Sequence, residues 1–153
     1  RQRISGNCMP TFSNGGVEID FLDEGEGEPI VLVHGFASTK EVNWVQPGWV
    51  STLTRAGRRA IALDNRGHGR SSKLHDPAAY HSAVMAEDVR ALLDHLSIDR
   101  ADGIGYSMGA RISAPAPLAS AIPACGAARL SWSCVFHSRR DAAISRAMAT
   151  RIL

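Results

Sequence analysis

The residues from Gly105 to Gly109 read Gly-Tyr-Ser-Met-Gly and fit the pattern G-x-S-x-G. Ser107 carries a hydroxyl, and a hydroxyl on a tight turn between a strand and a helix can act as an exposed nucleophile. Such a turn forces its central residue toward an unfavourable backbone region, and side chains two positions away would collide with neighbouring backbone. Gly105 and Gly109 meet that steric demand, so the pattern indicates nucleophilic catalysis by Ser107.

Strands must position a turn of this kind, and three apolar runs in the chain end in glycine-bearing loops. Residues 29–33 are apolar and rich in β-branched side chains, as in a strand buried on both faces, and lead into His34, Gly35 and Phe36. Residues 60–63 lead into the loop 64–72, and residues 102–105 lead into the serine turn, after which a helix can begin. The sequence therefore predicts three strands, each of which ends in a glycine-bearing loop.

Three motifs, in this order, resemble those of the α/β-hydrolase superfamily, in its lidded or lidless esterase, lactonase and perhydrolase-like branch. They are His34-Gly35-Phe36, Asp64-x-Arg66-Gly67-x-Gly69-x-Ser71 and Gly105-x-Ser107-x-Gly109, and the resemblance spans residues 17–112. It implies an α/β fold with a doubly wound, mostly parallel sheet, preceded here by an antiparallel amino-terminal hairpin. It also implies a serine hydrolase acting on carboxylic esters or related acyl compounds of small size. By the same resemblance, Ser107 is the nucleophile, and the backbone amides of Phe36 and Met108 form the oxyanion hole. Serine at this turn disfavours the epoxide-hydrolase and dehalogenase branches, which use aspartate there.

A serine nucleophile also needs an imidazole base that is oriented by a carboxylate. In this family the chain order is serine, acid, histidine, but downstream of Ser107 the chain offers only His137 and Asp141, in reversed order. We therefore expect an incomplete α/β-hydrolase fold with little activity. The alternative is a non-catalytic binding protein or a defective fragment, which could associate with itself through an exposed sheet edge.

Composition narrows the remaining classes of protein. The formal net charge is +2, and acids and bases are interspersed over most of the 153 residues. The sequence therefore shows no cluster of basic residues of the kind that binds nucleic acid. We expect no membrane span, because no apolar run approaches about 20 residues. Cys8, Cys125 and Cys134 have no paired short spacing and favour free thiols in a reducing cytoplasm.

No cofactor or metal is expected from the motifs. Met108 stands where the dinucleotide fingerprint that starts at Gly103 would need its third glycine, and no Walker-type motif is present. Neither a His-x-x-x-His motif nor a carboxylate cluster is evident in the sequence.

The chain divides into three segments by composition. Residues 1–8 are predicted to be an extension, residues 9–113 the amino-terminal part of the hydrolase domain, and residues 114–153 an atypical tail rich in alanine, serine and arginine. Pro115 and Pro117 would break the helix after the nucleophile, which suggests a shifted reading frame, with a divergent tail as the alternative. Residues 130–136 alternate as a strand does, and residues 144–152 could form a helix, although chance explains both signals equally well.

Further elements follow from local patterns. Asn14-Gly15-Gly16 predicts the turn of an opening hairpin, and residues 47–57 predict a short helix. A longer helix should present one apolar stripe, with charged residues outside that stripe; the stripe comprises Val84, Met85, Val89, Leu92, Leu93 and Leu96, and the charged residues are Glu87, Asp88, Arg90 and Asp94.

The remaining polar and aromatic side chains have mainly structural interpretations. Asp64 and Arg66 should pin their loop through hydrogen bonds and an ion pair, while His34 and His68 should shape loops rather than transfer protons. Trp44, Trp49 and Phe36 either line a pocket or belong to the core. We expect surface or helix-flanking positions for the other upstream histidines, which are His75, His81 and His95.

Overall fold

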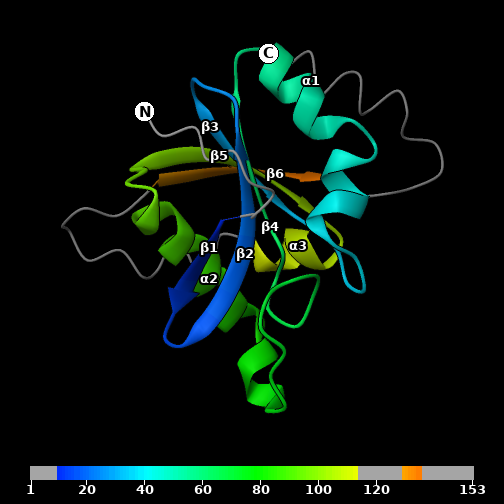
Figure 1. Ribbon diagram of the computed structural model, residues 1–153, viewed down its shortest axis with the longest axis vertical. Helices are drawn as coiled ribbons and strands as arrows, with labels where there is room; N and C mark the ends of the chain where they lie inside the picture. Colours follow the sequence, from blue (N-terminus) through cyan, green and yellow to red (C-terminus); the bar gives the residue numbers. More distant parts are fainter. Residues whose placement is uncertain (1–9, 114–128, 136–153) are drawn as a thin grey trace.

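The computed structural model describes residues 10–113 and 129–135, which contribute to one six-stranded sheet in the order β1-β2-β4-β3-β5-β6 (Figure 1). The strands are β1 (Thr11–Asn14), β2 (Val17–Glu24), β3 (Pro29–Val33), β4 (Arg59–Leu63), β5 (Arg100–Tyr106) and β6 (Arg129–Val135). Strands β4, β3, β5 and β6 run parallel, whereas β2 is antiparallel to both β1 and β4. The predicted fold class, a mostly parallel sheet with an antiparallel amino-terminal hairpin, is confirmed.

The hairpin of β1 and β2 turns at the predicted glycines. Asn14 pairs with Val17, so the loop consists of Gly15 and Gly16 alone, with φ angles of 58° and 84°. Positive φ at both central residues defines a tight turn whose twist matches that of the flanking strands, and glycine adopts it without steric cost.

Helical segments connect the parallel strands. They are the single-turn π-helix η1 (Glu41–Val45), α1 (Trp49–Arg55), the short 3₁₀ segment η2 (Pro77–Tyr80), α2 (Ser82–His95) and α3 (Met108–Ile112). The two predicted helices correspond to α1 and α2. His81 caps α2, because its Nδ1 accepts a hydrogen bond from the Ala83 amide.

Alternate residues of the central strands face two separate cores. Val31 and Val33 of β3 pack with α2 on one face of the sheet, whereas Ile30 and Leu32 pack with α1 and Trp44 on the other. Successive side chains of a strand point to opposite faces, so a fully apolar run supplies both cores at once. The sheet is therefore covered on both faces, with α1 and α2 on opposite sides (Figure 1).

The predicted apolar stripe of α2 is correct at Met85, Val89 and Leu92, but wrong at two other positions. Asp88, expected on the outer face, is 1% exposed, and Val84, expected in the stripe, is 37% exposed. Asp88 can be buried because the Arg66 guanidinium meets its carboxylate within the protein. A helix that faces a polar loop can thus carry a buried charge, even though the pattern of apolar and polar residues along the helix predicts that this charge is exposed to solvent.

The predicted strand at 130–136 is confirmed as β6, which pairs in parallel with β5 over its whole length. The helix after the serine turn ends at Ile112, and the Ser113 hydroxyl donates to the Gly109 carbonyl at 2.7 Å. Several expectations lie outside the described residues: the extension at 1–8, the prolines at 115 and 117, His137, Asp141 and the helix at 144–152.

The strand order defines a switch point between β3 and β5, at the carboxyl ends of the parallel strands. The chain leaves β3 for the neighbour on one side, β4, and leaves β5 for the neighbour on the other side, β6. In open α/β sheets ligands bind where two such connections diverge, outside the carboxyl ends of the strands. The segments 34–37 and 107–109 follow β3 and β5 at this switch point. Among the described residues, no helix is long and apolar enough to cross a bilayer.

Candidate active site

Ser107 lies at the carboxyl end of β5 in a strained turn. Its φ and ψ are 52° and −110°, and α3 begins at the next residue. A residue other than glycine in such a region costs on the order of 1–3 kcal/mol, and strain of this kind gathers at functional sites. The serine is exposed. Among the described residues, no hydrogen bond takes up its hydroxyl.

The positions two residues before and after Ser107 require glycine because a Cβ atom would not fit there, not because their φ angles are positive. A Cβ atom on Gly105 would lie 2.6 Å from the Ala110 nitrogen and from the Gly109 carbonyl carbon, and one on Gly109 would collide with the Val33 carbonyl group. Real Cβ contacts essentially never fall below 3.0 Å. Helix α3 therefore lies directly against β5 and β3, and this close approach holds Ser107 at the sheet edge.

The loop after β3 lies beside the serine turn. A Cβ atom on Gly35 would be 3.4 Å from the Ser107 Cβ and 2.8 Å from the Tyr106 ring. The Gly35 amide donates to Asn43 Oδ1 at 2.9 Å, which ties this loop to η1. The sequence motifs at 34–36 and 105–109, about 70 positions apart, thus meet at one place.

Two backbone amides at this place have no hydrogen-bond acceptor within the part of the chain that the structure describes. The amides of Gly35 and Ala37 donate to Asn43 and to His68, but no hydrogen bond within the described residues takes up the Phe36 amide between them. Met108 is the first residue of α3, where an amide has no partner inside its own helix. Free amides of this kind can stabilise an oxyanion.

His34 is fully buried and neutral. Its Nδ1–H donates to the Gly35 carbonyl at 2.7 Å, and its Nε2 accepts from the Asn65 amide at 3.0 Å. Burial lowers the pKa of His34 and outweighs the Gly35 hydrogen bond and the Asp64 charge, which raise it. The imidazole therefore bridges the loops after β3 and β4, in keeping with its predicted structural role.

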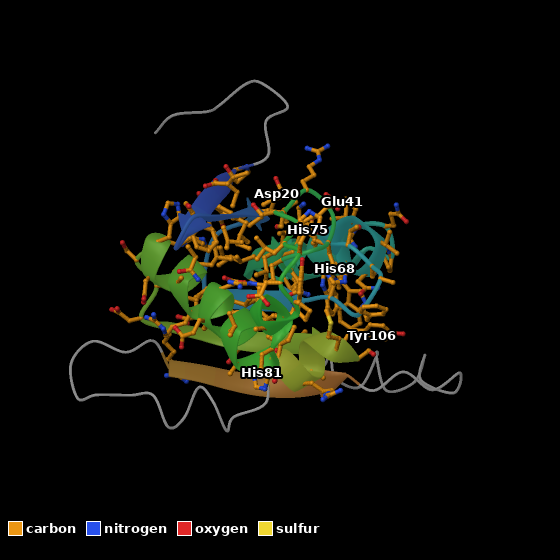
Figure 2. The ribbon with its side chains drawn as sticks, turned by 90° about the horizontal axis from the view of Figure 1, so that it is seen from below. Asp20, Glu41, His68, His75, His81 and Tyr106 are labelled. Atoms are coloured by element: carbon orange, nitrogen blue, oxygen red, sulfur yellow. The ribbon has the colours of Figure 1, made fainter. Side chains whose placement is uncertain are left out.

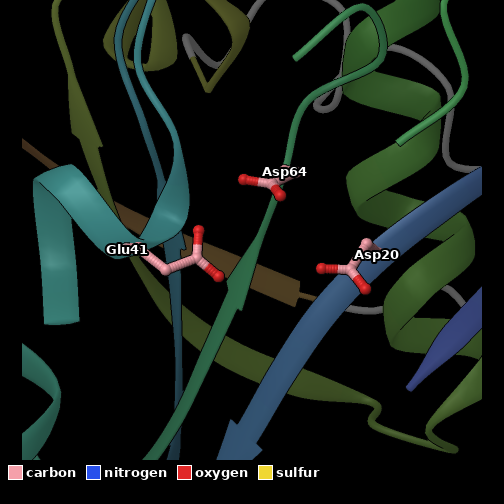
Figure 3. A group of neighbouring side chains, drawn as sticks. All are labelled: Asp20, Glu41 and Asp64. Atoms are coloured by element: carbon pink, nitrogen blue, oxygen red, sulfur yellow. The ribbon is translucent and has the colours of Figure 1, made fainter. Parts of the chain in front are cut away.

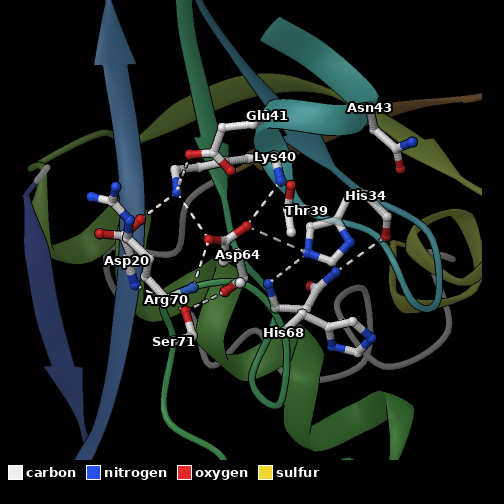
Figure 4. Close-up of polar contacts among 12 residues, drawn as sticks. Asp20, His34, Thr39, Lys40, Glu41, Asn43, Asp64, His68, Arg70 and Ser71 are labelled. Carbon is white, nitrogen blue, oxygen red and sulfur yellow. Dashed lines mark hydrogen bonds and ion pairs between the residues drawn. The ribbon is translucent and has the colours of Figure 1, made fainter. Parts of the chain in front are cut away.

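A network around Lys40 fixes the loop after β4 (Figure 4). The Lys40 ammonium, fully buried, contacts Asp20, Asp64 at 2.9 Å and Glu41 at 3.0 Å. Burial opposes charge on Lys40, but these carboxylates prevail and raise its pKa. Burial likewise opposes ionisation of Asp64, yet the amides of Lys40 and Arg70 and the Lys40 ammonium lower its pKa. Asp64 is thus an ionised anchor.

The carboxylates of Asp20, Glu41 and Asp64 form a cluster that could in principle hold a metal ion, and their oxygens lie within 4.8 Å of one another (Figure 3). This cluster could not be recognised from the sequence, because the three residues come from β2, η1 and the loop after β4. The ammonium of Lys40 contacts all three carboxylates. The Lys40 ammonium therefore takes the place that a metal ion would need, and the cluster has a structural role.

Arg66 pins the same loop to α2. Its guanidinium donates to both oxygens of Asp88 at 2.6 Å, and Asn14 Nδ2 donates to Asp88 at 2.8 Å. The two residues expected to pin this loop thus have different partners: Asp64 pairs with Lys40, and Arg66 pairs with Asp88. Gly69 is required because a Cβ there would collide with the Asp64 carboxylate, and Gly67 because a Cβ would meet the Tyr80 ring.

A pocket of about 640 Å³ opens beside the two free amides. Phe36 and Met108 both line it, and the other lining residues are Gly67, His68, Tyr80, His81, Ser82, Met85, Arg111 and Ile112. Phe36 is 76% exposed and meets the His68 ring edge-to-face at 5.8 Å. Of the three aromatic residues considered from the sequence, Phe36 lines the pocket, whereas Trp44 belongs to a core and meets Trp49 edge-to-face.

The upstream histidines do not gather around Ser107. His75 is exposed, His81 caps α2, and His95 stacks on Phe12 at 5.4 Å. Figure 2 shows where His68 and Tyr106 lie relative to His75 and His81. Four polar residues in or beside this site were not singled out from the sequence: Asp20, Lys40, Asn43 and Asn65. Only their place in the fold reveals them, because their partners are distant in sequence.

Comparison with known proteins identifies the family of this chain. The family model for the alpha/beta hydrolase fold matches residues 28–119, more than half of the chain, and the protein therefore belongs to the α/β-hydrolase family. The chain is 35% identical over 94 residues to a non-heme chloroperoxidase of Kitasatospora aureofaciens, covering 61% of this chain and 32% of that one. It is 34% identical over 99 residues to an epoxide hydrolase of Caballeronia sordidicola, covering 65% and 29%.

A solved structure of similar fold is Est816, described as an N-acyl homoserine lactone degrading enzyme. It superposes with a TM-score of 0.64 at 34% identity, over 79% of this chain and 42% of that one. The chain spans about a third or less of the length of the curated relatives it matches.

Proposed function

We propose that this protein is the nucleophile-bearing part of a serine hydrolase that acts on carboxylic esters or related acyl compounds. The observation that carries the proposal is the exposed hydroxyl of Ser107, held in a strained turn beside a loop whose Phe36 amide has no acceptor in the described part of the chain. Relatives named as an epoxide hydrolase and as a lactone-degrading enzyme support a small-molecule substrate.

In the proposed reaction, the Ser107 oxygen forms a bond to the carbonyl carbon of the substrate, and the hydroxyl proton passes to a general base. The carbonyl π electrons move to oxygen, where the amides of Phe36 and Met108 donate to the oxyanion. Collapse of this intermediate breaks the bond to the alcohol, which leaves with a proton. Water then hydrolyses the acyl-serine and restores the hydroxyl.

Serine is favoured over the aspartate-based branches because of the residue at the turn itself. An epoxide hydrolase of the aspartate type needs a carboxylate where this chain carries Ser107. Similarity to an epoxide hydrolase extends over the scaffold, whereas the reacting group differs. We therefore infer acyl chemistry rather than epoxide opening.

The pocket beside the two amides suits an apolar acyl group. Met85, Met108 and Ile112 supply apolar surface, and the volume of about 640 Å³ falls in the range of small-molecule sites. Turnover by this chain should be slow, because no imidazole is hydrogen-bonded to Ser107 among the residues that the structure describes, and a serine hydroxyl without a base is a weak nucleophile.

That same lack of a paired imidazole also supports the second candidate, a non-catalytic binding protein that uses the pocket. Such a protein could associate with itself through the sheet edge formed by β6, which pairs only with β5 within the described strands.

Labelling with a fluorophosphonate probe separates the two functions. In this reaction a serine oxygen forms a bond to phosphorus and fluoride leaves. We expect stoichiometric labelling on Ser107, slow release of phenol from an activated aryl ester, and loss of both in Ser107→Ala. Labelling that persists in Ser107→Ala would reject the assignment of the nucleophile. An unlabelled protein that still binds small acyl compounds would favour the binding function.

A further inference from the structure

The loop that carries the Phe36 amide is strained and needs an external support. Ala37, directly after Phe36, has a φ of 53°, although it carries a Cβ. L-residues other than glycine seldom adopt this region, and they stay there only when the surroundings over-determine it. Residues 36 and 37 are also exposed, so burial of their side chains does not hold the loop in this conformation.

His68 provides a hydrogen bond at this point. The Ala37 amide donates to His68 Nε2 at 3.2 Å, across 31 positions of sequence. On the other side of the ring, Nδ1 lies 3.0 Å from the Arg66 carbonyl oxygen. A carbonyl can only accept and an amide N–H can only donate, so the ring carries its proton on Nδ1 and leaves Nε2 as the acceptor. Both contacts hold with a neutral imidazole alone.

The ring is held from both sides by aromatic contacts. It meets Phe36 edge-to-face at 5.8 Å and His34 edge-to-face at 5.2 Å. Its own backbone is anchored as well, because the His68 amide donates to the Asn65 carbonyl at 2.9 Å, and the neighbouring Gly67 amide donates to Ser72 at 2.8 Å. The imidazole therefore connects the loop after β3 to the loop after β4 and is held in one orientation.

This geometry leaves His68 unsuited to act as the base for Ser107. The Nε2 lone pair is occupied by the Ala37 amide, and the Nδ1 proton is directed to Arg66. A ring that accepted a proton would present a second N–H to the Ala37 N–H and lose that contact. His68 can support the site only by holding the loop.

We propose that His68 is a positioning residue of the oxyanion hole: its neutral Nδ1–H tautomer, braced on the Arg66 carbonyl, captures the Ala37 amide and so fixes the preceding Phe36 amide beside Ser107. This inference rests on the proposed function for its catalytic consequence. The tautomer and the hydrogen bond to Ala37 do not depend on any activity.

Three substitutions at position 68 separate the hydrogen bonds from the packing. His68→Gln can place a side-chain oxygen where Nε2 lies and keeps the acceptor for Ala37. His68→Asn reaches only as far as the Nδ1 position, so it can keep the bond to Arg66 but not the one to Ala37. His68→Phe keeps an aromatic ring against Phe36 and loses both bonds. Thermal unfolding of each variant shows whether the fold survives.

The first measurement is the rate of Ser107 phosphonylation by a fluorophosphonate at increasing probe concentration. We expect the limiting rate to fall by about tenfold or more in His68→Asn and His68→Phe, with half-saturation little changed, because an oxyanion donor acts in the transition state. His68→Gln should retain a rate within about threefold of the parent. Equal limiting rates in all folded variants would overturn the inference. Labelling that persists in Ser107→Ala would instead overturn the proposed function.

The second measurement is nuclear magnetic resonance of the ¹⁵N-labelled protein, which reads the geometry without any reaction. The Ala37 amide should be protected from exchange in the parent and in His68→Gln, and exposed to exchange in His68→Asn and His68→Phe. The His68 ring should show a protonated Nδ1 and an unprotonated Nε2. An unprotected Ala37 amide in the parent, or the opposite tautomer, would refute the role of His68 even if the protein proved inert to the probe.

Discussion

Lys40 and Asp64 are joined twice: the Lys40 ammonium lies 2.9 Å from one carboxylate oxygen of Asp64, and the Lys40 backbone amide donates to the other at 2.9 Å. Both residues are fully buried. The pair connects the loop after β3 with the loop after β4, so this buried ion pair also sets the spacing between the two loops.

Replacing Lys40 by methionine should strongly destabilise the protein. The change leaves Asp20 and Asp64 buried without their cation, and breaking a buried ion pair in this way typically costs about 3–5 kcal/mol. Urea unfolding measures the loss, with Lys73→Met as the control, because Lys73 is exposed and donates only to backbone carbonyls. Equal stability of the two variants would contradict the role given to Lys40.

Acid should destabilise the fold in two separate windows of pH. The pKa of His34 is lowered in the fold by burial, so from about 6.5 downward the unfolded chain binds a proton that the folded chain does not. The pKa of Asp64 is lowered by hydrogen bonds and by Lys40, which outweigh its burial. Its stabilisation is present above the ordinary carboxyl value of about 4 and is lost as pH falls through the lowered pKa.

Unfolding free energy measured from pH 7.5 to 3 tests this expectation. Stability should decline as pH falls below about 6.5, and His34→Gln should flatten that first decline while leaving the second. A pH profile of His34→Gln that runs parallel to that of the parent between about pH 6.5 and 5 would show that His34 is not held neutral.

Arg66→Met should be far more damaging than Arg90→Met. Arg66 makes a bidentate pair with Asp88 in the interior, whereas Arg90 pairs with Glu87 and Asp94 on the helix surface, where it is 44% exposed. Losing one partner of a buried pair costs about 3–5 kcal/mol, while exposed pairs contribute about 0–1 kcal/mol. Thermal unfolding of the two variants should therefore differ clearly, and a similar shift in both would mean that burial does not strengthen the Asp88 contact.

Gly109→Ala should abolish labelling at Ser107 even in the fraction of the protein that remains folded. The added Cβ collides with backbone at Val33, which must push α3 away from β3 and reorient the serine turn. Gly15→Asn is a suitable control, because a Cβ there meets nothing within 4 Å, and asparagine tolerates positive φ. Undiminished labelling of folded Gly109→Ala would show that the turn does not depend on this close approach.

Local patterns were sufficient to predict most of the scaffold. The apolar runs at 29–33 and 60–63 identified β3 and β4, and the two glycines at 15 and 16 identified the hairpin turn. Alternation at 130–136 was compatible with β6 but did not distinguish a strand from chance. These signals depend on neighbours a few residues apart, which the sequence displays directly. The outward assignment of Asp88 was wrong because the partner that permits its burial, Arg66, is 22 positions away.

By itself, the sequence determined which groups could react and where the chain had to turn: a serine between two glycines, three glycine-bearing loops and the strands that precede them. Only the tertiary structure decided how those loops are held, with Lys40 among three carboxylates, Asn43 on the Gly35 amide and His68 on the Ala37 amide. The physical reason is that backbone propensity acts between near neighbours, whereas hydrogen bonds and charge pairs depend on distances that exist only after the sheet has assembled.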